Sequence, residues 1–308
     1  METSGKRARV ICNPNSGGGD YDPQSVKAEL DQFDIEWIKT SQSGEACKLA
    51  REYKGGLLIV IGGDGTVNEV VNGLGQAGFP EDVTLAILPT GTGNDLAATL
   101  AVPEDPDLAE DAIRKGRVRK LDAARVRSEG KKEKFFINVA TGGFGAAASG
   151  ENDESMKSTW GKLSYLRATL EAARKFDARD TLLTLDGEER RIQAVNIVVG
   201  NCRYAGGGWL AAPVANPEDG LLDVVVIEPL GMKSMLGLAP AAFAEYDYLG
   251  TEGVFHARAR SIRVYTEPEG LEFTADGEVI GDEPARFDIV PGALKVIVGD
   301  EYIAEPGG

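Results

Sequence analysis

The sequence of 308 residues contains a single histidine, His256, and only three cysteines, Cys12, Cys47 and Cys202. An odd number of widely spaced cysteines favours reduced, buried thiols over a disulfide framework or a zinc site. With one histidine the HExxH motif of zinc proteases cannot occur, and the GxxxxGK[ST] and GxSxG patterns are also missing. These absences exclude zinc proteases, P-loop nucleotide hydrolases and serine hydrolases of the common types.

Long apolar runs are missing as well. No stretch of about 18 apolar residues, the length needed to cross a bilayer, is present. The N-terminal segment Met1–Arg7 lacks the apolar core of a signal peptide. The sequence therefore predicts a cytoplasmic protein without a transmembrane helix.

Positive charge is scarce, because 33 Lys and Arg stand against 49 Asp and Glu, which gives a net charge of −16. This balance argues against nucleic acid as a partner. Either the acids are spread over solvated faces, or one membrane-facing surface is locally basic. The basic residues available for such a surface lie at 114–120 and 131–134, where a solvated helix end and hairpin are the simpler interpretation.

The composition is otherwise that of a soluble globular protein, with 42% hydrophobic and 27% charged residues, and the length fits two modest domains. Strands and helices alternate in the N-terminal part, the rhythm of a parallel sheet. Strands then predominate, Lys134–Val139 among them, with helices expected near 161–176 and 231–249. We predict an α/β domain over residues 1–123 and an antiparallel β-sandwich over 124–292.

A glycine-rich turn follows the apolar run Leu57–Ile61, which is long enough for a buried strand. The turn reads Gly62-Gly63-Asp64-Gly65-Thr66, and apolar residues at helical spacing come next. Glycines let the backbone approach an anion, and the N–H groups at a helix start point at it. The acid in the turn suits a metal or a nucleotide hydroxyl, so the pattern predicts a nucleotide used with a metal ion.

The same logic recurs twice. Val83–Leu88 leads into a turn over residues 89–95, and Ala8–Cys12 leads into the segment 13–19. One such turn could be purely structural, because strand-to-helix turns need glycine anyway. Three of them at the carboxyl ends of three strands indicate the ligand-binding edge of an open α/β sheet.

Taken together, segments 13–17, 62–69 and 88–97 resemble the diacylglycerol kinase catalytic domain family, which includes sphingosine kinases, ceramide kinases and bacterial lipid kinases. The resemblance continues in the family's order to the C-terminal part of the chain. The Gly62-to-Thr66 signature alone is shared with NAD kinases and phosphofructokinases, whereas the whole series is specific to lipid kinases. The later matching segments are 138–145, 206–208, Pro213, 219–223 and 276–278.

This resemblance implies an α/β plus β fold. The N-terminal domain would be a Rossmann-like three-layer α/β domain of the NAD kinase and phosphofructokinase type, and the C-terminal domain an antiparallel β-sandwich. The last strand, at about 293–304, would return to the first domain.

The resemblance also implies ATP and Mg²⁺ as cofactors. Asp64 and Asp95 are expected near Mg²⁺, although Asp95 could instead cap a helix that starts at Leu96. The residues expected to bind the nucleotide are Asn13, Ser16, Gly17, Thr40, Gly62, Gly63, Asp64, Gly65, Thr66, Asn68, Thr92, Asn94 and Asp95.

The sequence Asp-Gly-Glu occurs twice, at 186–188 and 276–278. Asp-Gly between two strands predicts a hairpin turn, and we assign that role to the first copy. The second copy matches the family's catalytic position. We expect Glu278 to accept the proton, Asp276 to be its partner or an alternative base, and Asp64 to be the third catalytic acid.

Two further expectations concern the C-terminal half. Bacterial lipid kinases similar to this chain imply a structural Mg²⁺ held by the carboxylate of Asp219 and the carbonyls of Asn216 and Leu221, although a plain turn would fit nearly as well. His256 has no catalytic motif around it, so we expect a structural or surface role.

The implied activity is transfer of the γ-phosphate of ATP to a lipid hydroxyl, most simply diacylglycerol to phosphatidic acid, with peripheral contact at a membrane surface. NAD kinase and a nucleotide-binding regulator without catalysis are the alternatives. The identity of the lipid acceptor stays open, because a sphingoid base, phosphatidylglycerol or an isoprenoid alcohol fits the sequence equally well. Apolar residues at 236–243 could line its pocket, and a homodimer is an open alternative.

Overall fold

The computed structural model describes residues 6–16, 26, 30–128, 130–143, 177–229, 248–267, 270–281 and 285–305. The chain forms two compact units, one of Met1–Asp122 with Gly292–Ile303 and one of Ala123–Pro291 with Ala304–Gly308. The helices expected near 161–176 and over most of 231–249, and the apolar segment 236–243, lie outside the described residues.

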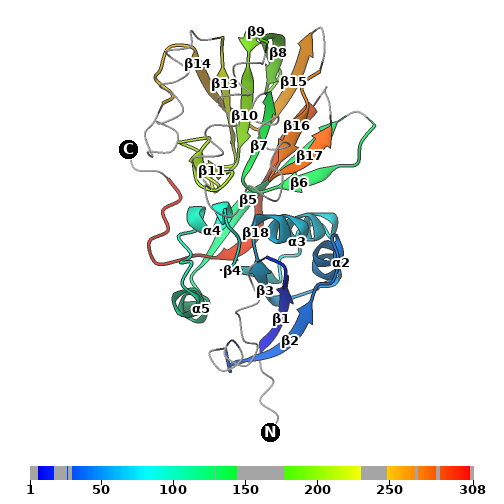
Figure 1. The fold of residues 1–308 in the computed structure, drawn as a ribbon, viewed down its shortest axis with the longest axis vertical. Coiled ribbons are helices and arrows are strands. Elements are labelled where there is room, and N and C mark those ends of the chain that lie inside the picture. The colour runs from blue at the N-terminus through cyan, green and yellow to red at the C-terminus, as the bar shows by residue number, and fades with distance from the viewer. Residues whose placement is uncertain are drawn as a thin grey trace. The chain divides into compact units, whose positions relative to one another are not determined.

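The first unit is built on a parallel sheet (Figure 1). Two of its strands, Gly56–Gly62 and Val83–Pro89, are buried along nearly their whole length, as expected of parallel strands covered on both faces. The order across the sheet is β2 (Phe33–Lys39), β1 (Lys6–Cys12), β3 (Gly56–Gly62) and β4 (Val83–Pro89). The helices are α2 (Glu45–Glu52), α3 (Asp64–Gln76), α4 (Asp95–Thr99) and α5 (Pro106–Lys115).

The last strand of the chain, β18 (Ala285–Ile297), contributes to both units. In the first unit, Lys295 and Val296 pair in parallel with β4. Just beyond the strand, the Gly299 N–H donates to the Leu100 carbonyl at 2.9 Å. A Cβ atom on Gly299 would lie 1.7 Å from the Ala101 carbonyl oxygen, so only glycine fits there.

Helices α2 and α3 pack against each other, and the packing explains two residues of α3. The N-terminus of α2 has no side-chain cap of its own, and Glu69 of α3 accepts the N–H groups of Gly44 at 2.8 Å and Ala46 at 3.2 Å. Gly73 is the contact point, because a Cβ atom there would lie 2.2 Å from the Cys47 carbonyl oxygen. The two helices therefore approach to backbone contact.

We expect Gly73→Ala to lower the free energy of unfolding by about 2 kcal/mol, because an inserted methyl group forces the helices apart. In an open helical position the same substitution would stabilise by up to about 1 kcal/mol. Gly65→Ala is the matched control in the same helix, since a Cβ atom there meets nothing within 4 Å. Urea unfolding of both variants measures the difference, and equal stability of Gly73→Ala and the wild type would contradict this close packing.

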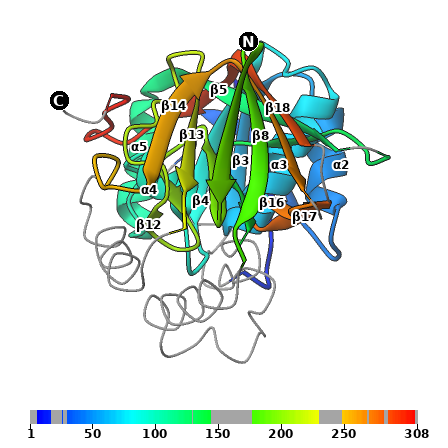
Figure 2. The same cartoon turned by 90° about the horizontal axis from the view of Figure 1, so that it is seen from above.

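The second unit is a sandwich of two sheets whose strands pair antiparallel. Figure 2 shows β14 beside β13 in the first of these sheets. That sheet runs β14 (Val254–Ala259), β13 (Leu222–Ile227), β10 (Asn196–Gly200), β7 (Val139–Gly143), β16 (Phe273–Ala275) and β17 (Glu278–Gly281). The other contains β5 (Val118–Ser128), β6 (Lys134–Phe136), β8 (Arg179–Leu185), β9 (Glu188–Ala194), β15 (Ser261–Glu267) and the start of β18. A small hairpin joins β11 (Tyr204–Ala205) to β12 (Trp209–Leu210).

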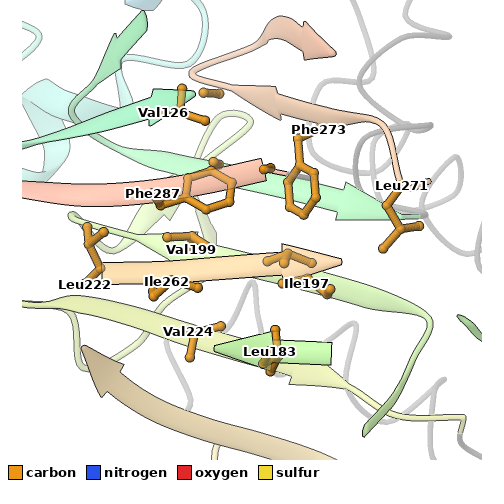
Figure 3. Packing of buried hydrophobic residues seen from close by; sticks show 14 of the residues in the cluster. Val126, Leu183, Ile197, Val199, Leu222, Val224, Ile262, Leu271, Phe273 and Phe287 are labelled. Carbon is orange, nitrogen blue, oxygen red and sulfur yellow. The ribbon is translucent and has the colours of Figure 1, made fainter. Parts of the chain in front are cut away.

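The core of the sandwich is apolar and draws side chains from both sheets, as Figure 3 shows. Phe287 of one sheet meets Phe273 of the other in an edge-to-face contact, with ring centroids 5.3 Å apart. Ile197, Val224 and other fully buried aliphatic residues fill the space around them. The predicted fold class, a parallel α/β domain followed by an antiparallel β-sandwich, is confirmed.

One predicted strand is wrong in detail. Lys134–Val139 was expected to be continuous, but β6 ends at Phe136 and β7 begins at Val139. The backbone N–H groups of this break do not join a sheet ladder, because the carboxylate of Asp276 binds them.

Candidate active site

The three turns of the first unit meet at one edge of its parallel sheet. They follow β1, β3 and β4, which are neighbours. The Asn13 side chain donates to Thr66 Oγ1 at 3.0 Å, and the hydroxyls of Ser16 and Thr90 lie 3.2 Å apart. The Thr90 N–H donates to the Gly62 carbonyl at 3.1 Å. Residues from all three turns are therefore held together by hydrogen bonds.

The glycines of two turns touch each other. A Cβ atom on Gly63 would lie 2.9 Å from Gly91 Cα, and one on Gly91 would lie 2.6 Å from Gly63 Cα. Packing between the turns thus explains these glycines in part. Gly65 differs, because it is exposed and a Cβ atom there would meet nothing within 4 Å. Its lack of a side chain keeps the backbone at the start of α3 open to a ligand.

Asp64 connects the turn that follows β3 to the turn that follows β4. It is the first residue of α3, and its Oδ1 accepts the N–H of Asp95 at 2.8 Å. Burial raises the pKa of the Asp64 carboxyl, while hydrogen bonds from the backbone N–H groups of residues 94–96 act in the opposite direction. Folding therefore places an acid where its charge is poorly solvated.

Helix α4 begins at Asp95, one residue before Leu96, where it would begin if Asp95 were the N-cap. Asn94 is its N-cap, in the left-handed conformation with φ 51°, and Asp95 is its first residue. The Asn94 side chain accepts from the Gly91 N–H at 2.9 Å and donates to the Gly91 carbonyl at 2.8 Å. The idea that Asp95 caps a helix starting at Leu96 is therefore wrong, and Asp95 is 6% exposed.

The other residues expected around the nucleotide differ in exposure. Thr40 is buried beside the end of β1, where its N–H donates to the Cys12 carbonyl at 2.8 Å, and Thr92 is exposed in the turn that follows β4. Asn68 is 2% exposed and accepts from the Asn72 side chain at 2.8 Å, so it faces its own helix. Gly17 lies outside the described residues. Thr90 was not among the expected site residues, although its place beside Gly91 was a usable signal.

The two Asp-Gly-Glu segments fold alike. Both aspartates have positive φ, 50° at Asp186 and 45° at Asp276, and the glycine after each is also left-handed. Such pairs are typical of type I′ hairpin turns. Asp186 accepts the N–H groups of Arg260 and Ser261 at 3.0 and 2.8 Å. In both copies, then, the aspartate is a hairpin residue that also anchors a neighbouring segment.

Asp276 is bound by more backbone groups than its counterpart. Its two oxygens accept the N–H groups of Ile137 at 2.9 Å, Asn138 at 3.0 Å and Val139 at 3.1 Å. Glu278 differs in kind, because its side chain is 44% exposed and its Oε2 lies 2.9 Å from the Lys134 ammonium. Of the two carboxylates, that of Glu278 is therefore less occupied by hydrogen bonds.

We expect Asp276→Asn to lower the free energy of unfolding by about 2 kcal/mol, because an amide cannot accept three N–H groups as a carboxylate does. The phosphoryl transfer expected from the sequence should fall as well, since the turn that carries Glu278 loses its anchor. Asp186→Asn is the matched control: it should lose stability and keep its activity. Urea unfolding and turnover are measured together. Complete loss of transfer with unchanged stability would make Asp276 itself the base.

The loop expected to hold a structural Mg²⁺ is closed by its own hydrogen bonds. Asp219 Oδ1 accepts the Leu221 N–H at 2.9 Å, and Asn216 Oδ1 accepts the Glu218 N–H at 3.0 Å. The Arg258 guanidinium lies 3.6 Å from the other Asp219 oxygen. Within the described ranges, no cluster of three His, Cys, Asp or Glu side chains could hold a metal ion. The Mg²⁺ site at Asn216, Asp219 and Leu221 stays a prediction.

His256 lies on β14, and its Nε2 is 2.6 Å from Asp223 Oδ1. Asp223 belongs to the neighbouring strand β13 and has a side chain that is only 1% exposed. The contact therefore joins two adjacent strands of the sandwich.

Several of the basic residues at 114–120 have partners within the first unit. Arg114 and Lys115 pair with Asp111, and Lys115 also pairs with Asp300 at 2.5 Å. Arg117 donates to the carbonyl of Asp300 at 2.7 Å. Among the helices that the structure describes, none is long and apolar enough to cross a membrane.

Comparison with known proteins places both halves of the chain. The family described as "Diacylglycerol kinase catalytic domain" matches residues 7–126, and "YegS C-terminal NAD kinase beta sandwich-like domain" matches residues 138–298. "Probable lipid kinase YegS-like" of Cronobacter sakazakii is 33% identical over 93% of this chain and 94% of its own length. "Diacylglycerol kinase" of Bacillus subtilis is 28% identical over 92% and 93%.

A similar solved structure agrees with these relatives. The crystal structure of a diacylglycerol kinase from Bacillus anthracis str. Sterne superposes with a TM-score of 0.72 at 25% identity. It covers 97% of this chain and 98% of that one. Similarity of sequence and of fold thus extends over both units.

Proposed function

Because the chain belongs to the diacylglycerol kinase catalytic domain family of lipid kinases, we propose that it transfers the γ-phosphate of ATP to the hydroxyl group of diacylglycerol and forms phosphatidic acid. The observation that carries the proposal is the meeting of three glycine-rich turns at one edge of the parallel sheet, with the acid Asp64 among them. Such an edge suits a nucleotide.

The first unit would hold the nucleotide. The exposed backbone at Gly65 and the start of α3 offer N–H groups to the phosphates, and Asn13, Ser16 and Thr92 line the adjoining turns. The Asp64 carboxyl is desolvated, and a cation bound beside it would offset that cost and lower its raised pKa. Asp64 and Asp95 would hold Mg²⁺, which offsets charge on the phosphates during transfer.

The second unit would supply the base. Glu278 accepts the proton of the acceptor hydroxyl while the hydroxyl oxygen forms a bond to the γ-phosphorus. The bond between that phosphorus and the oxygen bridging it to the β-phosphate then breaks, and ADP leaves. Asp276 keeps the turn in place through its three backbone N–H partners. A lipid acceptor also implies peripheral contact with a membrane.

The decisive experiment follows labelled γ-phosphate from ATP, with Mg²⁺, into diacylglycerol in mixed micelles. A sphingoid base, phosphatidylglycerol, an isoprenoid alcohol, NAD and a sample without acceptor are run beside it. Label in phosphatidic acid supports the proposal, and label in another lipid keeps the kinase and changes its acceptor. Label in NADP alone would replace the proposal with NAD kinase, and no transfer to any acceptor would favour a regulator.

A further inference from the structure

Glu278 and the turn that carries it are contacted on two sides by one short stretch of chain. Lys134, the first residue of β6, donates to Glu278 Oε2 at 2.9 Å and to the Val279 carbonyl at 3.2 Å. Only two residues separate Lys134 from Ile137, whose N–H is the first of three bound by Asp276. The stretch 134–139 thus fixes the aspartate end of the turn through its backbone and the glutamate end through a side chain.

Lys134 is itself firmly placed. It pairs with Val126 across the β5–β6 hairpin, and the next two residues, Phe135 and Phe136, are buried in the sandwich. Its backbone is therefore fixed, and its ammonium, on a side chain that is 36% exposed, is held by the Val279 carbonyl as well as by Glu278. The Glu278 side chain is 44% exposed, and without a partner it would sample several rotamers.

The first Asp-Gly-Glu turn provides an internal comparison. It has the same backbone conformation and the same anchoring aspartate, but within the described residues no lysine pairs with Glu188. An exposed ion pair contributes at most about 1 kcal/mol to stability, so stability alone is a weak reason for a lysine at one turn and not at the other. The lysine accompanies the glutamate that matches the catalytic position.

We infer that Lys134 is a positioning residue for Glu278, which holds the carboxylate in the orientation that receives the hydroxyl proton. This inference rests on the proposed function. Lys134 acts through Glu278 and not on the phosphates. A misplacement of about 1 Å can lower a rate about 10²-fold, so losing the orienting contact affects turnover more than nucleotide binding.

A double-mutant cycle tests the inference, using whichever lipid acceptor the wild-type chain phosphorylates. Lys134→Met is expected to lower kcat by about 10-fold to 10²-fold and to leave KM for ATP unchanged. Lys134→Arg should restore much of the rate, since a guanidinium can make the same contacts. Lys132→Met removes an exposed lysine from the same hairpin and should behave as wild type. Thermal unfolding of every variant checks that it is folded.

The cycle is completed in a Glu278→Gln background, with residual transfer measured in single turnovers. There Lys134→Met should cause no further loss, because residues that act as a unit are not additive. Additive losses would overturn the inference, because Lys134 would then act independently of Glu278. The positioning role of Lys134 would also be overturned if Glu278→Gln lost phosphoryl transfer while Lys134→Met kept a normal kcat. The proposed function would then still stand. Normal activity of Glu278→Gln would overturn both this inference and the proposed base.

Discussion

Replacing Glu278 by glutamine is expected to lower phosphoryl transfer by about 10²- to 10⁴-fold, the usual contribution of a general base. Glutamine keeps the size of the side chain and an oxygen for the Lys134 ammonium, so the turn should retain its shape. What it loses is the ability to accept a proton. ATP binding should be unchanged, because the residues proposed to bind the nucleotide belong to the first unit.

The matched control is Glu188→Gln, in the turn with the same conformation. It should transfer phosphate at the wild-type rate. ATP affinity is measured by titration calorimetry beside turnover for both variants. A folded but inactive Glu188→Gln would mean that the first Asp-Gly-Glu copy is the catalytic one.

Asp64→Asn is expected to reduce transfer by about 10²- to 10³-fold, as typically happens when one group that stabilises transition-state charge is removed. The same substitution should increase the stability of the folded protein relative to wild type as the pH rises. Because the folded state raises the pKa of Asp64, it binds that proton more tightly than the unfolded chain does. The resulting stabilisation is present below the ordinary aspartate pKa, about 4, and is lost as the pH rises through the raised value.

Asparagine has no such titration. The stability of Asp64→Asn relative to wild type should therefore increase between about pH 4 and pH 7. Thermal unfolding midpoints across this range measure it. Asp111→Asn is a control of opposite sign in a lower range: hydrogen bonds from Lys115 and Arg114 lower the pKa of Asp111, so the wild-type contribution is lost only as the pH falls below about 4. A constant difference between Asp64→Asn and wild type would show that folding does not perturb this carboxyl.

The parallel sheet and its turns could be predicted because their signals are local. Buried strands such as β3 and β4 are continuous apolar runs, and the glycines that follow each strand lie within a few residues of it. Since parallel strands end at the same edge, the sequence alone assigns three separate turns to one place.

The details that failed depend on contacts between distant residues. The break between β6 and β7 has no local cause, because Asp276, which binds its N–H groups, lies more than 130 residues further along the chain. The same separation hides the pairing of Lys134 with Glu278. The start of α4 is a smaller miss: Asn94 tolerates the left-handed conformation and closes on Gly91, a signal present in the sequence.

The pairing of β18 with β4 has a consequence for synthesis on the ribosome. Domains generally fold in the order in which they emerge, the N-terminal one first. On the side of β4 away from β3 the neighbour is Lys295–Val296, so the first unit is complete only after Val296 has been translated. Until then β4 is an unpaired edge, a place where nascent chains tend to associate. The nascent N-terminal half should therefore depend on a chaperone longer than its size suggests, and a fragment ending at Asp122 should aggregate.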